Sequence, residues 1–513
     1  MNRTTPALAA LALTLIVPAA RAEEACAALT GAVATDTTIS AATAEPSGPF
    51  TMPDGHKIDN LPAFCRVEGT IKPTADSDIR FELWLPQHSA WNGRMLVVGN
   101  GGYVGEIRYD ELEPALRRGY AVASADGGHH DASDYRKESL DWGEGHPERI
   151  ADWAYRSIHV TAVAARSLIR AYEGRPASHA YYFGCSTGGG QGLMAAQRYP
   201  DDFDGIIAGA PGNNRTGLNM GFLWQATQNL ADPAGTIPPA KLPAINRAAL
   251  AACSKADGVD QGLIADPRQC RFDPAALRCT AGDADDNNCL TQPQIATLKR
   301  LYAGAPAYFG WPVGSEFGYL GGWGYAIQGP EPFRLSFFRQ WVFKDPAWDW
   351  HGFDWTRDPP RVREAVGGLV DAVDPDLRPF RAHGGKLILY HGWADPIGNA
   401  YDTIHYYEAV ERRVPDTASF ARLFLFPGMG HCRGGIGPNS FDPIGALEDW
   451  VERGRAPEQL VALKSPTTDE TGGLAIGAPG SGRTRPACAY PATAHYRGKG
   501  SLDEAASYIC RRH

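Results

Sequence analysis

Residues 181–190, with the sequence Tyr-Tyr-Phe-Gly-Cys-Ser-Thr-Gly-Gly-Gly, restrict the possible folds of this chain more than any other segment. An apolar run leads directly into a Gly-x-Ser-x-Gly turn centred on Ser186, and a helical pattern follows at 191–199. So tight a turn accepts only small residues two positions on either side of the serine, and it lifts the hydroxyl clear of the sheet. The turn is typical of the α/β-hydrolase fold, so we predict that fold with Ser186 as a candidate nucleophile.

Short apolar runs elsewhere support a sheet of this type. Residues 79–85 alternate, whereas 94–98, 120–124 and 386–390 are continuously apolar. Continuous runs suit strands that are covered on both faces, as in a mostly parallel sheet flanked by helices. An amphipathic helix is expected at 158–172. The pattern therefore predicts alternating strands and helices.

The length of 513 residues exceeds what a single core usually supports, so we expect two domains or one domain with an insertion. Residues 214–375 are rich in Trp, Gly, Pro and Cys and interrupt the strand–helix pattern, which resumes with strands at 386–390 and 420–426 and a helix at 444–453. We interpret 214–375 as a lid domain inserted between two parts of the catalytic domain, 23–213 and 376–513.

The first 22 residues have the pattern of an export signal. Arg3 supplies the positive end, 11–17 the apolar centre, and Ala20-Arg21-Ala22 a small-x-small cleavage site. The apolar run is interrupted by Thr14 and Pro18 and is short for a membrane span. We therefore expect a secreted or periplasmic protein that has no membrane association after cleavage.

The charge distribution also narrows the possible partners. The formal net charge of -9 is spread along the chain, and no cluster of five or more Lys or Arg residues occurs. This argues against nucleic acid or an anionic membrane surface as the main partner. A small neutral or mildly anionic substrate remains possible.

A serine hydroxyl is a weak nucleophile near neutral pH, so Ser186 needs an imidazole and usually a carboxylate. In this fold the order along the chain is Ser, acid, His. Asp395 lies in the turn after strand 386–390, and His431 follows strand 420–426 through a Gly-rich loop. Their positions after successive core strands favour them as the acid and the base. Other histidines remain alternatives for the base: His391, His129 and His130.

The chain has ten cysteines, and two of them adjoin the candidate triad: Cys185 precedes Ser186 and Cys432 follows His431. If Ser186 and His431 are in contact, these cysteines are close enough for a disulfide that limits the motion of both loops. Two free thiols are the alternative, disfavoured after export. Short spacings also suggest pairs, among many that the sequence allows: Cys253–Cys270, Cys279–Cys289 and Cys488–Cys510.

Hydrolysis by a serine nucleophile develops an oxyanion, which this fold stabilises with the backbone N–H after the nucleophile and another from an early loop. Thr187 would supply the first N–H. Gly101 or Gly102, just after strand 94–98, would supply the second, and the sequence does not choose between them. The alternative for this loop is a simple turn.

The runs Gly-Cys-Ser-Thr-Gly-Gly-Gly-Gln at 184–191, Tyr-His-Gly-Trp-Ala-Asp at 390–395 and Gly-Met-Gly-His-Cys at 428–432 resemble the tannase and feruloyl esterase family. That family also includes a bacterial hydrolase of mono(2-hydroxyethyl) terephthalate. The resemblance implies a Cys185–Cys432 disulfide, supports the three short-range pairs and leaves Cys26 with Cys65. It also implies a lid over an aromatic acyl pocket, which His391 would line.

The resemblance further implies a structural calcium loop in the lid, with carboxylates spaced as Asp-x-x-Asp-Gly-Val-x-Asp-Gly. Two of the three expected carboxylate positions here are Ser254 and Gln261, so the site would be weakened, although Asp260 and Asp266 could compensate. The alternative is a disulfide-closed turn without metal. No organic cofactor is expected. The expected calcium ligands are Ser254, Asp257, Val259, Gln261 and Leu263.

The resemblance implies a serine ester hydrolase that cleaves feruloyl, hydroxycinnamoyl or galloyl esters through an acyl-enzyme. Lid aromatics such as Trp323 offer flat apolar area for a phenolic ring, and Arg334 or Arg339 could bind a carboxylate. An arginine in the pocket would favour the alternative substrate, a terephthalate monoester. Two other functional classes remain. One is a non-catalytic phenolic- or carbohydrate-binding protein, although the complete triad argues against it, and the other is a serine peptidase.

Overall fold

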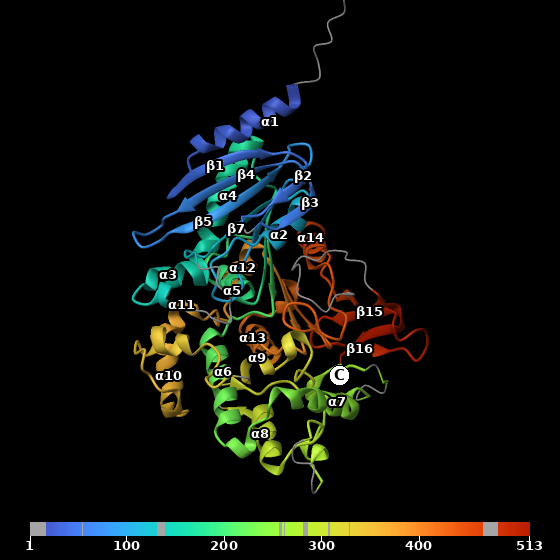
Figure 1. Cartoon of the computed structure of the whole chain (residues 1–513). Coiled ribbons are helices and arrows are strands. Elements are labelled where there is room, and N and C mark those ends of the chain that lie inside the picture. The colour runs from blue at the N-terminus through green and yellow to red at the C-terminus, as the bar shows by residue number, and fades with distance from the viewer. Residues whose placement is uncertain are drawn as a thin grey trace, which may run out of the picture.

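The computed structural model describes residues 17–53, 55–130, 139–255, 259–260, 262–280, 286–305, 308–327, 329–464 and 481–512. Its centre is a nine-stranded sheet (Figure 1). In order across the sheet, the strands are β1 Thr37–Glu45, β4 Phe64–Ile71, β5 Ile79–Pro86, β7 Ala121–Ala125, β6 Arg94–Val98, β8 His179–Cys185, β9 Gly205–Gly209, β12 Lys386–Gly392 and β13 Ala421–Phe426.

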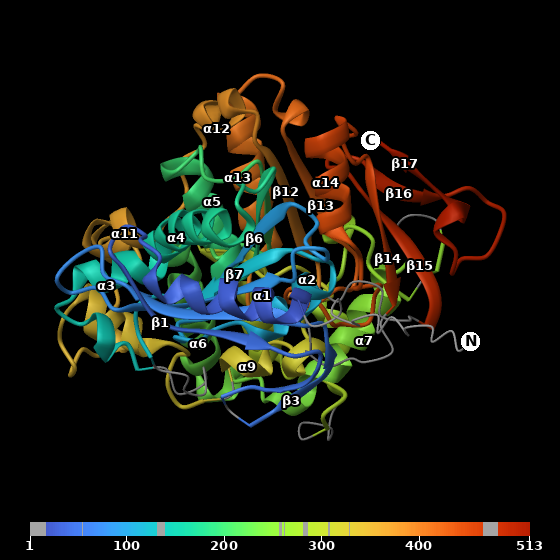
Figure 2. The ribbon, with the colours of Figure 1, turned by 90° about the horizontal axis from the view of Figure 1, so that it is seen from above.

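The six strands from β7 to β13 are parallel, whereas β1, β4 and β5 form an antiparallel edge. As the continuous apolar runs predict, the parallel strands are covered on both faces: in β12, Leu387 and Leu389 face one core, and Ile388 and Tyr390 face the other. Helices α4 Ser157–Glu173, α5 Thr187–Arg198, α12 Arg378–His383 and α13 Ala400–Arg413 cover the first face, and α2 Tyr109–Arg117 and α14 Pro443–Arg453 cover the second (Figure 2). The predicted α/β-hydrolase fold is confirmed.

Several smaller elements were not predicted. Helix α3 spans Pro147–Ala151, and three separate antiparallel pairs flank the sheet. The pairs are β2 Gly48–Thr51 with β3 Lys57–Leu61, β14 Gln459–Lys464 with β15 Ser481–Cys488, and β16 Thr493–Tyr496 with β17 Tyr508–Arg511.

Between β9 and β12, the described residues add no strand to the large sheet. Apart from α12, which packs on the sheet, their helices gather at the end of the molecule opposite β1 and β4 (Figure 1). Two apolar clusters fill this region, and one of them also includes Tyr103 and Trp153 from the N-terminal part of the chain. The limits 214 and 375 of a lid stay a prediction. The segment contains α6 Arg215–Leu230, α7 Leu242–Cys253, α8 Gln292–Ala303, α9 Gly324–Ile327, α10 Asp358–Val362, α11 Gly368–Val370 and the pair β10 Gly304–Ala305 with β11 Tyr308–Phe309.

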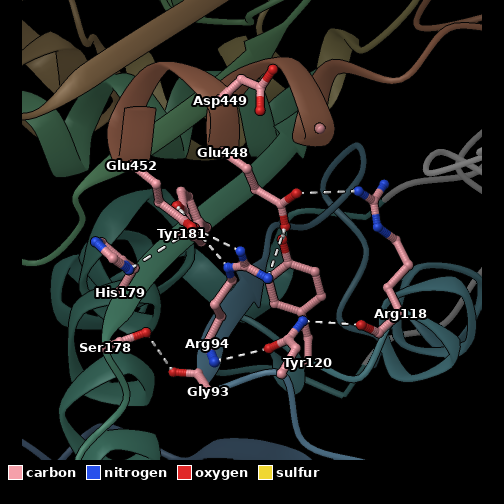
Figure 3. Close-up of polar contacts among 12 residues, drawn as sticks. Gly93, Arg94, Arg118, Tyr120, Ser178, His179, Tyr181, Glu448, Asp449 and Glu452 are labelled. Atoms are coloured by element: carbon pink, nitrogen blue, oxygen red, sulfur yellow. Dashed lines mark hydrogen bonds and ion pairs between the residues drawn. The ribbon is translucent and has the colours of Figure 1, made fainter. Parts of the chain in front are cut away.

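A polar network fixes α14 against the sheet (Figure 3). Arg94 of β6 donates two hydrogen bonds to Glu452, of 2.6 and 2.8 Å, and the Tyr181 hydroxyl of β8 donates a third of 2.8 Å. The Tyr120 hydroxyl, just before β7, donates to Glu448. The network therefore anchors the helix that follows the loop carrying His431.

All ten cysteines are paired, and the five disulfides are those predicted: Cys26–Cys65, Cys185–Cys432, Cys253–Cys270, Cys279–Cys289 and Cys488–Cys510. Helix α1, Val17–Ala27, runs across the expected cleavage point after Ala22, while residues 1–16 lie outside the described part. In the ranges that the structure describes, no helix has both the length and the apolarity needed to cross a membrane.

Candidate active site

Ser186 occupies the sharp turn between β8 and α5. Its φ of 62° and ψ of -119° lie in a region that residues other than glycine rarely adopt, which is typical of a nucleophile elbow. The turn is as crowded as predicted, because a Cβ at Gly184 would lie 2.5 Å from the carbonyl carbon of Gly188. The Ser186 N–H donates to the Gly209 carbonyl over 2.9 Å and anchors the turn to β9.

Ser186, His431 and Asp395 form a continuous hydrogen-bonded chain. His431 Nε2 lies 2.8 Å from Ser186 Oγ, and Nδ1 lies 2.6 Å from Asp395 Oδ2. A carboxylate can only accept, so Nδ1 carries the proton and Nε2 is left to accept from the serine hydroxyl. The arrangement is that of a serine nucleophile with its general base.

Asp395 is buried and receives hydrogen bonds on both oxygens. Oδ1 accepts from the backbone N–H groups of Ile397 and Gly398 over 2.7 and 2.9 Å, and Oδ2 faces the two histidine rings of His391 and His431. Burial by itself raises the pKa of Asp395, but attraction to His431 and the hydrogen bonds from both rings hold that pKa well below its usual value. Asp395 therefore remains ionised.

The structure does not place His391 where the resemblance implies. Its ring is fully buried behind the acid: Nε2 lies 3.0 Å from Asp395 Oδ2, and Nδ1 lies 2.8 Å from the Thr403 hydroxyl on α13. Alternation along β12 turns its side chain to the same face as Leu389. His391 supports the acid and does not line the pocket.

The rings of the other alternative bases, His129 and His130, contact groups other than Ser186. The ring of His129 stacks on Trp142 with centroids 3.9 Å apart. His130 bridges the carboxylates of Asp126 and Asp78 at 2.6 and 2.9 Å. Of the histidines considered from the sequence, His431 is the one that contacts the Ser186 hydroxyl.

The Cys185–Cys432 disulfide joins the residue before Ser186 to the residue after His431, across a sequence separation of 247 residues. Each cysteine is therefore one peptide unit away from a reacting side chain. The bond limits how far the serine turn and the histidine loop can separate, and small displacements of this kind are costly for catalysis.

The two segments expected to form the oxyanion hole lie together. The Gly188 N–H donates to the Asn100 carbonyl over 2.8 Å, and the Thr187 hydroxyl donates to the Gly102 carbonyl over 2.7 Å. Gly101 and Gly102 line the same pocket as Ser186. Gly102 has a φ of +52°, a conformation that favours glycine.

The pocket beside Ser186 and His431 has a volume of about 400 Å³. This volume suits a small organic ligand. Arg334, one of the two arginines considered for a carboxylate, lines the pocket with its guanidinium 4.7 Å from the ring centroid of Tyr103, and its binding of a carboxylate stays a prediction. Apolar lining residues are Met52, Val104, Ile107, Phe183, Leu320 and Ile397, and charged ones are Glu106, Arg108, Asp110, Glu111, Arg334 and Arg433.

Two other predicted substrate-binding residues lie elsewhere. Trp323 is fully buried in the inserted segment, where it stacks on Trp311 at 4.4 Å and its indole N–H donates to Ser315. Arg339 donates to the Trp348 carbonyl and to Glu331, outside the pocket. Both predictions were wrong because composition alone does not distinguish an aromatic or an arginine that packs within the segment from one that faces a ligand.

Sequence reasoning missed most of the charged lining residues. Arg433 follows Cys432 directly, so its place next to the His431 loop was a usable signal. Arg108 and Asp110, by contrast, pair with each other over 2.9 and 2.7 Å just before and within α2, and no motif marks them.

The expected calcium loop is only partly described, since Asp257 and Gln261 lie outside the described residues. Ser254 donates to Asp260 over 3.0 Å, and Lys255 pairs with the other oxygen of Asp260 at 3.5 Å. Asp266 is taken up by Arg268, and Leu263 is buried. Within the described residues, no group of three or more His, Cys, Asp or Glu side chains is arranged to hold a metal ion, so the described part of the loop offers no carboxylate set that fits calcium. Calcium binding stays a prediction.

Comparison with known proteins agrees with this geometry. The family model for tannase and feruloyl esterase matches residues 65–511. An uncharacterised esterase of Xanthomonas campestris pv. campestris is 39% identical over 99% of this chain and 94% of its own. Mono(2-hydroxyethyl) terephthalate hydrolase of Piscinibacter sakaiensis is 33% identical over 88% and 85%. The crystal structure of feruloyl esterase B from Aspergillus oryzae, 26% identical, superposes with a TM-score of 0.85 over 96% of this chain and 100% of that one. On the family model, the relatives and the shared fold, this chain is an esterase that belongs to the tannase and feruloyl esterase family.

Proposed function

We propose that this esterase hydrolyses aromatic carboxylic esters, of the feruloyl, hydroxycinnamoyl or galloyl type, through an acyl-enzyme on Ser186. The observation that carries the proposal is the chain of hydrogen bonds from Ser186 Oγ through His431 to Asp395, at the wall of the pocket. Serine esterases use this arrangement to make a hydroxyl nucleophilic at neutral pH.

In the proposed reaction, Ser186 Oγ attacks the ester carbonyl while its proton passes to His431 Nε2. Asp395 holds the imidazolium that forms, and the N–H groups of Thr187 and of Gly101 or Gly102 bind the oxyanion. Collapse of the tetrahedral intermediate releases the alcohol, which takes the proton from His431. Water then attacks the acyl-enzyme while His431 takes its proton. Collapse of this second tetrahedral intermediate releases the acid, and Ser186 Oγ takes the proton back from His431.

Substitution and labelling test the nucleophile. Ser186→Ala should abolish hydrolysis of methyl ferulate and methyl gallate while leaving the melting temperature within a few degrees. A fluorophosphonate probe should label the wild-type enzyme on Ser186 and leave the variant unlabelled. Activity in the variant, or labelling elsewhere, would overturn the proposal; lack of labelling together with binding of ferulate would instead favour a non-catalytic binding protein. Peptide substrates assayed in parallel distinguish a peptidase.

A second candidate substrate is an aromatic monoester that carries a free carboxylate, such as mono(2-hydroxyethyl) terephthalate. Arg334 favours it, because its guanidinium lines the pocket and could form a bidentate pair with a carboxylate. The relative from Piscinibacter sakaiensis is named for this ester.

Arg334→Leu distinguishes the two substrate types. If the pocket accepts a carboxylate, this variant should lower kcat/KM for mono(2-hydroxyethyl) terephthalate by about 10- to 100-fold, since a charged hydrogen bond is lost, and lower it much less for methyl ferulate. Arg339→Leu, outside the pocket, is the matched control. Equal effects on both esters would argue against carboxylate recognition by Arg334.

We also propose that residues 1–22 are an export signal removed from the mature enzyme. Five disulfides support this, because such bonds persist in oxidising compartments. After expression in a bacterial host, mass spectrometry of the exported enzyme should find Glu23 at its N-terminus. An exported protein that retains residues 1–22 would contradict this.

A further inference from the structure

The Thr187 hydroxyl lies between two parts of the molecule that are far apart in sequence. It donates to the Gly102 carbonyl over 2.7 Å and accepts from Arg215 Nη2 over 2.9 Å. A guanidinium can only donate, so the single proton of the hydroxyl must go to Gly102. Arg215 thereby fixes the direction of the Thr187–Gly102 hydrogen bond.

Arg215 is the first residue of α6, where the inserted segment leaves the catalytic part, and it is almost fully buried. Its guanidinium lies 5.2 Å from the ring centroids of both Tyr103 and Trp153. The hydrogen bond from Arg215 to Thr187 therefore joins the start of the insertion to the turn after Ser186. A charged hydrogen bond is strong in such a buried setting with little water.

Tyr103, directly after Gly102, is held from several sides. Its ring stacks on Trp153 with centroids 4.7 Å apart, and Asn219 of α6 donates to its hydroxyl over 2.8 Å. Arg334 lies over the same ring at 4.7 Å. The loop that carries Gly101 and Gly102 is thus clamped by the inserted segment on one side and by Thr187 on the other.

We propose that Arg215 is a positioning residue for the oxyanion hole, acting through the Thr187 hydroxyl and the Gly102 carbonyl. This rests on the proposed function, because it assigns the oxyanion hole to Thr187 and to Gly101 or Gly102. Neither Thr187 nor Arg215 is among the residues that line the pocket at Ser186. Their effect is to hold the loop N–H groups where negative charge develops in the transition state, so the effect falls on kcat and on binding of tetrahedral adducts.

The test compares Thr187→Val, which keeps the shape and removes the hydroxyl, with Thr187→Ser, which restores it. For methyl ferulate, Thr187→Val should lower kcat by about 10- to 100-fold with KM changed less than threefold, whereas Thr187→Ser should stay within about threefold of wild type. Arg215→Met should resemble Thr187→Val, and the double variant should lose little more than either single variant, because the two act as one unit.

Inhibitors separate positioning from general damage. Phenylboronic acid, which forms a tetrahedral adduct on the serine, should bind Thr187→Val and Arg215→Met more weakly, in step with kcat, while inhibition by ferulate stays unchanged. The matched control is Arg198→Met, because Arg198 of α5 also lies over a ring, that of Tyr155 at 4.4 Å, and donates to a carbonyl, that of Gly368 over 2.8 Å. This control should keep wild-type kcat.

Three results would overturn the proposal: wild-type kcat in folded Thr187→Val, equal loss of affinity for phenylboronic acid and ferulate, or additive losses in the double variant. If Arg215→Met does not fold, the two Thr187 variants still decide. Fluorophosphonate labelling of Ser186 in the wild-type enzyme tests the proposed function independently. A wild-type enzyme that is not labelled would contradict the proposed function, whereas the three results above would contradict the role of Arg215.

Discussion

His391 Nε2 lies 3.0 Å from Asp395 Oδ2, the same carboxylate oxygen that His431 Nδ1 contacts at 2.6 Å. Asp395 is thus oriented by a second histidine from the same strand end, and that histidine is held in turn by Thr403. An acid oriented in this way can keep the His431 ring in a single position through the reaction.

Substituting His391 should therefore impair catalysis without much effect on binding. His391→Ala removes one of four hydrogen bonds to Asp395, and we expect kcat to fall by about 10- to 100-fold with KM changed less than threefold. Thr403→Val, which removes the partner of His391, should have a weaker effect of the same kind. His405→Ala, an exposed position on α13, is the control. A His391→Ala enzyme with wild-type kcat would show that the contact is not needed.

The Cys185–Cys432 disulfide should matter for catalysis as well as stability. The Cys185→Ser, Cys432→Ser double variant should lose at least tenfold in kcat, because the two loops it joins carry the nucleophile and the base. The Cys279→Ser, Cys289→Ser variant is a matched control in the inserted segment. A disulfide that closes a longer loop lowers the entropy of the unfolded chain more. Loss of Cys185–Cys432 should therefore lower the free energy of unfolding by about 5 kcal/mol, and loss of Cys279–Cys289 by about 3 kcal/mol. Kinetics and urea unfolding check both, and equal kcat in the two variants would contradict the argument.

The central strands were predictable because their physical signal is local. Strands in the parallel part of the sheet are buried on both faces, so 94–98, 120–124 and 386–390 are apolar without alternation, and they appear as β6, β7 and β12 within two residues of the prediction. Strand β1 was missed because it lies at the sheet edge, and none of its residues is fully buried.

The candidate triad was predictable for a related reason. Ser186, Asp395 and His431 each follow a core strand, and the fold brings the ends of these strands to one edge of the sheet. The pocket wall was not predictable. Whether Trp323 or Arg334 faces the ligand depends on contacts between segments distant in sequence, such as the stacking of Trp323 on Trp311 or the place of Arg334 over Tyr103.

The network that holds α14 should contribute stability that depends on pH. Hydrogen bonds from Arg94 lower the pKa of Glu452 to about 2, although partial burial opposes this. Because the folded-state pKa is below the unfolded value, this contribution is present above about pH 4.5 and is lost as the pH falls through about 2.

Glu452→Gln should therefore lower the free energy of unfolding at pH 7 by on the order of 1–2 kcal/mol, a modest value because Glu452 is partly exposed and solvent screens its charge. The loss should be smaller near pH 3. The kcat of this variant should be little changed. Asp449→Asn breaks an exposed pair with Arg453 on the same helix and should cost less than about 0.5 kcal/mol. Urea unfolding at both pH values checks the difference. A Glu452→Gln penalty that is the same at pH 3 and pH 7 would contradict the assignment.

A second carboxyl should act in the opposite direction, at the base of the inserted segment. Burial, with a smaller contribution from the nearby Asp371, raises the pKa of Asp402 to about 7, although a hydrogen bond of 3.4 Å from Asn214 opposes the shift. Asp371 itself accepts from the Thr216 N–H and hydroxyl over 2.9 and 2.7 Å. The two carboxyls thus lie where the segment leaves and rejoins the sheet.

Since the folded-state pKa of Asp402 is above its usual value of 3.8, its protonated form favours folding below about pH 4, and this contribution is lost as the pH rises through about 7. Asp402→Asn removes the ionisation, so it should stabilise the enzyme at pH 8 by on the order of 1–3 kcal/mol and have little effect at pH 4. The exposed Asp59→Asn should change stability by less than about 0.5 kcal/mol at either pH. Melting temperatures of both enzymes across pH 4–8 provide the measurement. The difference between variant and wild type should be larger at pH 8 than at pH 4, and a smaller difference at pH 8 would contradict the prediction.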